Sequence, residues 1–287
     1  MDFSPHDMIL MEYTHRLAQA FVPDEIVFIH ITPRIEIPRK FLKEQPLTKE
    51  ELLAKLEGTV YDKFKDRAVV KCEVHEGTPS FDMWRESFIH HTDLIIFGEK
   101  NLEKGRKIVP ENFVRKSFCS VLFVPEGDFS FEKIWVPIDF SENSKDAIVF
   151  ADQLRSAYHR SHLTCHYVFE TPSINLVAKD QQEEYIEYFK HQSRQKMEAF
   201  IAPLSIPDVD FHCSPWVYVK PSDHIKEEAE QAQADMIIMS SGGKNRISSY
   251  LLGSNTIEMI QLEKRLPVLI LKNKVDKVKA WDILTNL

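Results

Sequence analysis

Ala234–Leu271 reads ADMIIMSSGGKNRISSYLLGSNTIEMIQLEKRLPVLIL, in which two apolar runs enclose a loop of small residues and a helix-like segment. The loop opens with Ser240-Ser241-Gly242-Gly243, and nine residues later Gly253-Ser254 begins the helix-like segment. Only 8 glycines occur in the chain, and three of them lie between positions 242 and 253. Glycine lets a backbone approach a ligand closely, and the free N–H groups at a helix start attract anions. This stretch therefore predicts a phosphate-binding loop between a strand and a helix.

The length of the chain predicts more than one domain. A chain of 287 residues exceeds most single cores, so two domains of roughly 140 residues each are expected. We place the boundary near Gly127–Phe131, which gives an N-terminal domain over 1–128, a C-terminal domain over 129–274 and a tail over 275–287. The net charge of −8 argues against nucleic acid as the main partner, since phosphate backbones require a basic face.

The remaining composition points to a cytoplasmic protein without a membrane partner. No apolar run approaches the roughly 18–20 residues of a membrane helix, and the N-terminus lacks a signal-peptide pattern. The four cysteines, Cys72, Cys119, Cys165 and Cys213, lie far apart without a CxxC pair. They are typical of reduced, mostly buried thiols and not of a disulfide or zinc framework.

The chain repeats itself. Asp2-Phe3-Ser4 recurs as Asp139-Phe140-Ser141 at an offset of 137 residues. At an offset of 142, Thr92–Phe97 (TDLIIF) aligns with Ala234–Met239 (ADMIIM). A shift that grows by a few residues indicates loop insertions between two copies of one fold.

Both copies alternate short apolar runs with amphipathic segments, which predicts βαβ units around parallel sheets covered on both faces. We expect strands near 25–32, 69–75, 93–98 and 120–125 in the first copy, and near 133–138, 163–168, 210–218, 235–240 and 268–272 in the second. Helices are expected near 143–158, 181–200, 222–233 and 254–264 in the second copy.

The first copy lacks its first strand. It begins at Met1-Asp2-Phe3, where the second copy has six residues of strand before Asp139. In a sheet of this class the first strand is central, so its absence leaves unpaired backbone groups. A mis-set start, a rearranged sheet and replacement by another segment remain as explanations, and the tail Val275–Leu287 is a candidate replacement.

Together, the repeat, the strand-end aspartate and the glycine loop resemble the universal stress protein family. Its motif is G-x2-G-x9-G-[S/T]; in the second copy Ser240 holds the first glycine position, followed by Gly243 and Gly253-Ser254. VPIDFSENS at Val136–Ser144 and a histidine in the second strand (His166, with His30 in the first copy) also fit. The resemblance implies tandem open α/β sheets of strand order 3-2-1-4-5, of the adenine nucleotide alpha hydrolase-like class.

The resemblance further implies an ATP site, with Mg²⁺ or Mn²⁺ as an accompanying ion, at the carboxyl ends of the strands. Asp139 would contact adenine or ribose, Tyr167 and Val168 would line the adenine pocket, and Met239 and Ser240 would border the ribose. The phosphates would be held by Gly243, Gly253, Ser254 and Thr256. Asp139 has a second interpretation as a cap of the following helix, and the glycines have one as an ordinary turn.

The first copy departs from this motif. Gly98 is present, but the segment after it offers no glycine-serine pair and brings Glu99, Glu103 and Glu111 instead, which would repel phosphates. We expect the first copy to have lost nucleotide binding and to act as a structural partner. One site per chain is therefore predicted.

Other chemistries have weaker support. SSGGKN is similar to the SGGxDS loop of adenylating enzymes, but that loop follows a first strand, and Asn245 and Arg246 replace its Asp and Ser. No GxxxxGK[ST] string occurs, no histidine spacing predicts a zinc site, and no Ser-His or Cys-His pair is evident.

The sequence thus predicts a regulatory or protective ATP-binding stress protein. Two alternatives remain: a nucleotide-free interaction scaffold in which Ser240 closes the pocket, and an enzyme acting on an adenylated or phosphorylated metabolite. The resemblance also implies that fifth strands pair across a two-fold axis. Val121–Val124 and Val268–Leu271 are therefore expected to pair within one chain, which gives an intramolecular pseudo-dimer and allows a further homodimer.

Overall fold

The structure, a computed structural model, describes residues 1–32, 46–98, 110–127, 130–158, 161–216, 220–242, 254–262 and 265–272. What we call the N-terminal half contains α1 (His6–Phe21), β1 (Glu25–Thr32), α2 (Lys49–Phe64), β2 (Val69–Glu76), α3 (Pro79–Ile89), β3 (Leu94–Gly98), α4 (Pro110–Lys116) and β4 (Ser120–Val124). What we call the C-terminal half contains β5 (Lys133–Pro137), α5 (Glu142–Ser156), β6 (His162–Glu170), α6 (Gln182–Ile201), β7 (Val209–Trp216), α7 (Pro221–Gln231), β8 (Met236–Ser240), α8 (Ser254–Leu262) and β9 (Val268–Leu271).

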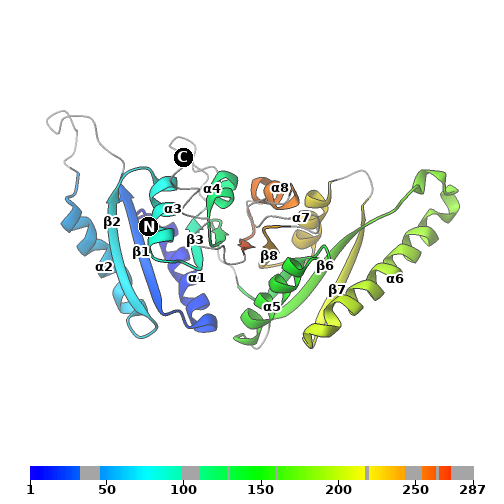
Figure 1. The fold of residues 1–287 in the computed structure, drawn as a ribbon, viewed down its shortest axis with the longest axis horizontal. Helices are drawn as coiled ribbons and strands as arrows, with labels where there is room; N and C mark the ends of the chain where they lie inside the picture. Colours follow the sequence, from blue (N-terminus) through cyan, green and yellow to red (C-terminus); the bar gives the residue numbers. More distant parts are fainter. Residues whose placement is uncertain are drawn as a thin grey trace.

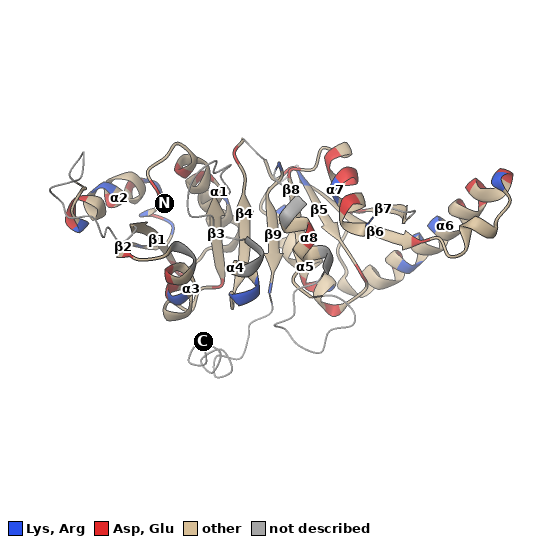
Figure 2. Cartoon of the chain, turned by 90° about the horizontal axis from the view of Figure 1, so that it is seen from above, with Lys and Arg blue, Asp and Glu red and all other residues tan. Residues whose placement is uncertain are grey.

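The fold is α/β with mainly parallel strands, as predicted from the apolar runs. Seven strands form one sheet in the order β3-β4-β9-β8-β5-β6-β7, seen from above in Figure 2. Within the C-terminal half, β5 to β9 are the first to fifth strands, so their order β7-β6-β5-β8-β9 reads 3-2-1-4-5. All pairs in this half are parallel.

The two halves meet at an antiparallel strand pair. Val121, Leu122 and Phe123 of β4 lie opposite Ile270, Leu269 and Val268 of β9. The predicted pairing of these two segments is therefore confirmed, and each strand covers an edge of the other that would otherwise be exposed.

Two hydrophobic clusters cover the two faces of this sheet, as expected for strands buried on both sides. Leu122 and Val124 point into a cluster with α1, α5 and α6, whereas Val121 and Phe123 point into a cluster with α3, α4, α7 and α8. The alternation follows from the period of two in a β-strand. Figure 1 shows the resulting layers.

The remaining strands, β1 and β2, form a separate two-stranded parallel sheet. It packs with α2 around a small cluster that contains Phe28, Leu56, Val60 and Phe64, and Met11 of α1 joins this cluster. The order in the N-terminal half therefore has a break between β1 and β3, where a first strand was predicted to be missing. The tail proposed as its replacement lies outside the described residues.

Within the described part of the chain, no helix has the length and apolarity needed to cross a membrane. All four cysteines are free, and three of them are buried, as the sequence predicted. Burial raises the pKa of the Cys165 thiol to about 12 and that of Cys72 to about 11, so these thiols stay protonated at neutral pH.

Candidate functional site

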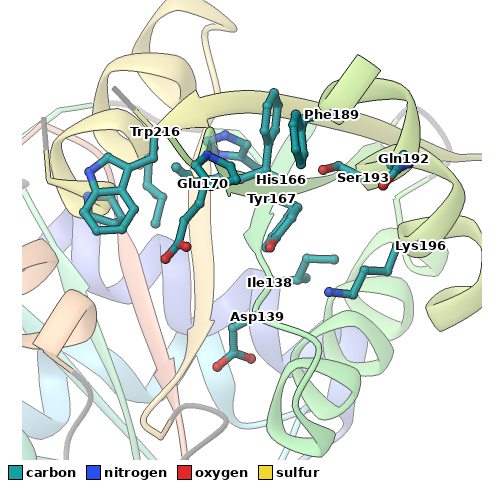
Figure 3. A pocket seen from close by; sticks show the side chains of 15 residues that line it. Ile138, Asp139, His166, Tyr167, Glu170, Phe189, Gln192, Ser193, Lys196 and Trp216 are labelled. Carbon is teal, nitrogen blue, oxygen red and sulfur yellow. The ribbon is translucent and has the colours of Figure 1, made fainter. Parts of the chain in front are cut away.

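A cavity of about 460 Å³ opens at the carboxyl ends of β5 and β6. Figure 3 shows it between these strands and α6. Ligands of open parallel sheets bind outside the carboxyl ends of the strands, so the cavity lies where this fold class places them. The residues that line it are Ile138, Asp139, His166, Tyr167, Val168, Phe169, Glu170, Pro172, Phe189, Gln192, Ser193, Lys196, Trp216, Pro221 and Ile225.

Asp139 lines this cavity from the turn that follows β5. Its Oδ1 accepts hydrogen bonds from the Ser141 backbone N–H (3.0 Å) and from the Ser144 hydroxyl (2.6 Å). Phe140 has a φ of 62°, and Ser141 caps α5 by accepting from the Ser144 N–H. The N-cap of α5 is therefore Ser141, and the interpretation of Asp139 as the cap is wrong: Asp139 holds the turn before the helix through Oδ1. The predicted contact with adenine or ribose stays a prediction.

The wall beside Asp139 is aromatic and carries a cation. The rings of Phe140 and Tyr167 meet edge to face with centroids 4.5 Å apart. Lys196 of α6 places its ammonium 4.2 Å from the Phe140 centroid and 5.7 Å from that of Tyr167. Figure 3 shows this side chain reaching from α6 toward Ile138. A π surface beside a positive charge suits a flat heteroaromatic ring that bears phosphate.

His166 contributes a neutral imidazole to the floor. The Trp135 indole N–H donates to its Nδ1 (3.2 Å), so Nε2 carries the proton and donates to the Ser214 hydroxyl (2.7 Å). Burial lowers the pKa of His166 to about 3, and His212 and His224 add to this shift. Both nitrogens are engaged, so His166 fixes β6 against its neighbours and does not act as an acid or base.

The β8 side of the predicted site lies next to β5, because Ile134 and Trp135 pair with Met236 and Ile237. Met239 is buried in the core, and Val168 of β6 packs against the same cluster. The Ser240 hydroxyl donates to the Gly242 carbonyl (3.1 Å).

Thr256 and Asn143 tie this loop to two helices. The buried Thr256 hydroxyl donates to the Ser240 carbonyl (3.1 Å), and the Asn143 amide of α5 donates to the Gly242 carbonyl (3.3 Å). Gly243 and Gly253 lie outside the described residues, and Ser254 is the first residue of α8. The structure thus brings Asp139, Tyr167 and Val168 to one cavity. Met239 and Ser240 end the adjoining strand β8, and Thr256 of α8 is bonded to that strand end.

Sequence reasoning missed the α6 wall of the cavity. Phe189, Gln192, Ser193 and Lys196 all line it and lie on one helical face. The spacing of 3, 4 and 7 residues from Phe189 was the available signal. A packing stripe and a cavity wall have the same spacing, so the pattern alone does not separate them.

A protein-family model described as the universal stress protein family matches residues 130–272. The chain belongs to this family through that segment. Two universal stress proteins of Methanocaldococcus jannaschii, MJ0531 and MJ0577, are each 26% identical to it, over 149 and 159 residues. The first alignment covers 52% of this chain and 86% of MJ0531, and the second covers 50% and 96% of MJ0577.

Solved structures extend the likeness to almost the whole chain. A universal stress protein from Archaeoglobus fulgidus, 20% identical, is matched over 95% of this chain and 96% of that one with a TM-score of 0.63. A functionally unknown protein, PA1789 from Pseudomonas aeruginosa, is 13% identical and is matched over 96% and 92% with a TM-score of 0.66. At these identities the likeness concerns the fold.

The N-terminal half of this universal stress protein has the same turn but a different crevice. Phe3, like Phe140, has a φ of 62°, and the Ser4 N–H donates to the Asp2 carboxylate (3.1 Å). Gly98 is the residue equivalent to Ser240 in the repeat. The ring of His6 lies against Gly98, and a Cβ added there would be 2.6 Å from His6 Cδ2. His6 is buried and its Nε2 lies 3.1 Å from the Val124 carbonyl oxygen. An imidazole thus fills the space beside the first glycine position of the motif.

Proposed function

We propose that this universal stress protein binds ATP, or another adenine nucleotide, in its C-terminal half and serves a regulatory or protective role in a stress response. The observation that carries the proposal is the cavity of about 460 Å³ at the carboxyl ends of β5 and β6, lined by Asp139, Tyr167 and Val168. The resemblance seen in the sequence predicts these same three residues as ligand contacts. Family membership over residues 130–272 supports the same site.

In this proposal the adenine ring lies against Tyr167 and Val168, and the ribose approaches Asp139, Met239 and Ser240. The phosphates extend toward the start of α8, whose first N–H groups have no partner within the helix and attract anions. Gly243, Gly253, Ser254 and Thr256 hold them, with Mg²⁺ or Mn²⁺ as the accompanying ion. Lys196 adds positive charge on the opposite wall of the cavity, since its ammonium lies above the Phe140 ring.

The same proposal divides the chain into two universal-stress-protein-like domains over 1–128 and 129–274, joined as an intramolecular pseudo-dimer. The antiparallel β4–β9 pair supports this arrangement. The first domain is a structural partner without nucleotide, because His6 lies against Gly98, the position equivalent to Ser240, where the ribose would approach. We place the protein in the cytoplasm, in keeping with its free thiols.

An interaction scaffold without nucleotide is the alternative that a specific observation favours. Ser240 replaces a glycine, and its hydroxyl already bonds to the Gly242 carbonyl. A side chain at this position crowds the ribose if the ligand follows the family path. An enzyme acting on an adenylated or phosphorylated metabolite in the same cavity is the third hypothesis, and only a substrate screen separates it from ATP binding.

Isothermal titration of dialysed protein with ATP, with and without Mg²⁺, tests the proposal. We expect one site per chain, weakened at least tenfold by Asp139→Asn or Lys196→Ala. Asp2→Asn is the matched control, because Asp2 forms the same turn in the half without the cavity. Gly253→Asp, which adds a negative charge to the predicted phosphate loop, should abolish binding.

Mass spectrometry of small molecules released from freshly purified, denatured protein identifies the bound nucleotide. Absence of any released nucleotide, together with no titration heat, would support the scaffold. Equal loss of affinity in Asp2→Asn and Asp139→Asn would contradict the placement of the site in the C-terminal half.

A further inference from the structure

A second group of chemically active side chains lies in the N-terminal half, between the β1–β2 sheet and α3. Glu73 and His75 are two residues apart on β2, so their side chains lie on the same face of the strand. Glu86 lies in the last turn of α3 and His90 directly follows that helix, so they are four residues apart and share one helical face. Two pairs of residues from two elements thus meet at one place, with α2 packed on the opposite face of the sheet.

The ligand atoms of Glu73, Glu86 and His90 all lie within 4.8 Å of one another. His90 Nε2 is 3.0 Å from Glu73 Oε1 and 4.0 Å from Glu86 Oε2. In a tetrahedral site with metal–ligand bonds of about 2.0–2.2 Å, neighbouring ligand atoms are about 3.4 Å apart. The observed separations bracket this value, so small side-chain rotations bring the three atoms to coordination distance.

Each carboxylate is held on the side that faces away from His90. His75 Nε2 lies 2.8 Å from Glu73 Oε2, which leaves Glu73 Oε1 toward His90. Arg85 donates to Glu86 Oε1 through Nε (2.9 Å) and Nη2 (2.6 Å), which leaves Oε2 toward His90. Partners that bind the second oxygen of a ligating carboxylate orient the first one, as in known metal sites.

The charge around the cluster favours a cation. The carboxylates of Glu25, Glu73 and Glu86 lie within 4.0 Å of His90, and Asp82 is one turn before Glu86 on α3. In the described part of the chain, Lys71 pairs with Glu25, and Arg85 pairs with Asp82 and Glu86. These four carboxylates carry two more charges than Lys71 and Arg85 balance, and one divalent ion supplies that difference. The Glu86 side chain is only 6% exposed and that of His90 15%, so this imbalance lies in a poorly hydrated place where it is costly.

We propose that Glu73, Glu86 and His90 bind one divalent transition-metal ion, which fastens α3 to β2. One imidazole nitrogen with two carboxylate oxygens suits a borderline first-row ion such as Zn²⁺ better than Mg²⁺ or Ca²⁺, which prefer oxygen alone. The proposal is independent of nucleotide binding, because the cluster lies on the two-stranded sheet and the cavity lies in the other half.

The C-terminal half provides an internal comparison. Glu228 on α7 corresponds to Glu86 at the offset of 142 residues, and it meets a single imidazole, His212, at 2.9 Å. Within the described residues, the grouping of three suitable ligands occurs at the Glu73 cluster alone. The equivalent helix of the C-terminal half thus carries one histidine–carboxylate pair, whereas the N-terminal half has a second carboxylate and a second imidazole at this place.

Zinc binding to the full chain tests the proposal. The protein is stripped with a chelator, freed of nucleotide, and titrated with Zn²⁺ by calorimetry and by thermal unfolding, with Mg²⁺ as the comparison ion. We expect one Zn²⁺ per chain and a higher unfolding temperature with Zn²⁺ but not with Mg²⁺. His90→Ala should weaken binding at least about 100-fold, since even outer-sphere changes cost about 10–100-fold.

His91→Asn is the matched control. His91 is adjacent to His90 but exposed, and its φ of 53° is one that asparagine tolerates. Unchanged Zn²⁺ affinity in this variant supports the assignment. Far-UV circular dichroism without metal shows whether His90→Ala folds. If it folds poorly, Glu73→Gln, which keeps the shape of the side chain, tests the Zn²⁺ site instead. No Zn²⁺ binding, or equal binding in wild type, His90→Ala and Glu73→Gln, would overturn the proposal.

Discussion

Asp2–Ser4 and Asp139–Ser141 fold into the same turn, with a φ of 62° at the phenylalanine of each. They differ in what lies beside them. Asp139 follows β5, which pairs with both β6 and β8 and so holds the C-terminal half in one sheet. In the N-terminal half Met1 lies along β1 instead, where its backbone nitrogen donates to the Ile29 carbonyl (2.9 Å). The C-terminal half therefore has a central strand and five continuous strands. The N-terminal half lacks that strand among its described residues, and its four strands form two separate pairs.

The difference extends to the strand histidines. His166 is held between Trp135 and Ser214, and both partners come from strands that flank β6. His30 on β1 instead donates through Nδ1 to the Met1 carbonyl (2.8 Å) and lies against the Phe3 ring. The same residue type at the same strand position thus joins strands in one half and anchors an N-terminal segment in the other.

The strongest test of the comparison concerns the β4–β9 junction. Leu269 and Leu122 are fully buried partners across it. Leu269→Ala should lower the free energy of unfolding by about 2–5 kcal/mol, because it removes buried contacts and leaves a cavity. Leu176→Ala is the control; this side chain is 88% exposed, and its loss should change stability by less than about 0.5 kcal/mol.

Urea unfolding measures these energies, and segment-resolved hydrogen exchange locates the change. We expect protection to fall in both β3–β4 and β5–β8, because one sheet passes through the junction. A loss confined to β5–β8 would show that the halves unfold independently and would contradict the view that the junction couples them.

The second test gives the N-terminal crevice side chains found in the C-terminal crevice. Gly98→Ser installs the residue found at position 240 and brings a Cβ within 2.6 Å of the His6 ring. We expect a loss of about 1–3 kcal/mol from overpacking. His6→Asn in the same chain, which copies Asn143, should recover about 1 kcal/mol or more, as contacting residues couple by amounts of this size.

Gly58→Ser is the matched control for this pair. Gly58 lies within α2, and a Cβ there meets nothing within 4 Å. Serine is a slightly better helix former than glycine, so stability should not fall. Both variants and the double variant are compared by urea unfolding. Additive effects of Gly98→Ser and His6→Asn would contradict the role of His6 in closing the N-terminal crevice.

The sequence was sufficient for the strands and the junction because both depend on local apolar runs. MIIM and VLIL are long enough and apolar enough to specify buried strands without knowledge of their neighbours. The resemblance to the universal stress protein family then implied the pairing of the two fifth strands, which the repeat identified. Asp139, Tyr167 and Val168 were predicted through the resemblance to the universal stress protein family, which assigns its site to these positions at and near the strand ends.

The parts that sequence reasoning missed depend on elements that meet only in the folded chain. Lys196 reaches the cavity because α6 crosses the ends of β5 and β6, which its spacing along the helix does not reveal. The Glu73, Glu86 and His90 cluster combines a strand pattern with a helix pattern, and neither alone resembles a metal-binding motif. The contact of His6 with Gly98 likewise joins residues 92 positions apart, although the repeat identifies both positions.

The third test uses the buried histidine of the C-terminal half. The pKa of His166 in the folded protein is about 3, well below its ordinary value of 6.5. Below pH 6.5, His166 therefore binds a proton in the unfolded chain but not in the folded protein. The free energy of unfolding consequently falls as the pH drops from 6.5 toward 3. At pH 5.5 this group alone should lower the free energy of unfolding by about 1.4 kcal/mol relative to pH 8.

His166→Gln removes the titration while keeping a polar group near Ser214. The difference in stability between pH 8 and pH 5.5, measured by urea unfolding, should therefore be smaller in this variant by about that amount. An unchanged difference would mean that His166 is protonated in the folded protein, contrary to its contact with the Trp135 indole. His30→Gln provides the comparison in the N-terminal half.

The smallest expected effect concerns the shared turn itself. Ser141 caps α5 by accepting from the Ser144 N–H (3.2 Å), whereas Pro5 at the start of α1 provides no side-chain cap and the Asp7 carboxylate accepts the Asp2 and Phe3 N–H groups instead. Ser141→Ala should cost about 1 kcal/mol, and Ser141→Thr, which keeps the hydroxyl, much less. Urea unfolding of the three chains measures this. Equal stability of all three would mean that the Asp139 carboxylate alone maintains the turn. A carboxylate, Asp139 or Asp7, would then hold the turn before the first helix in both halves.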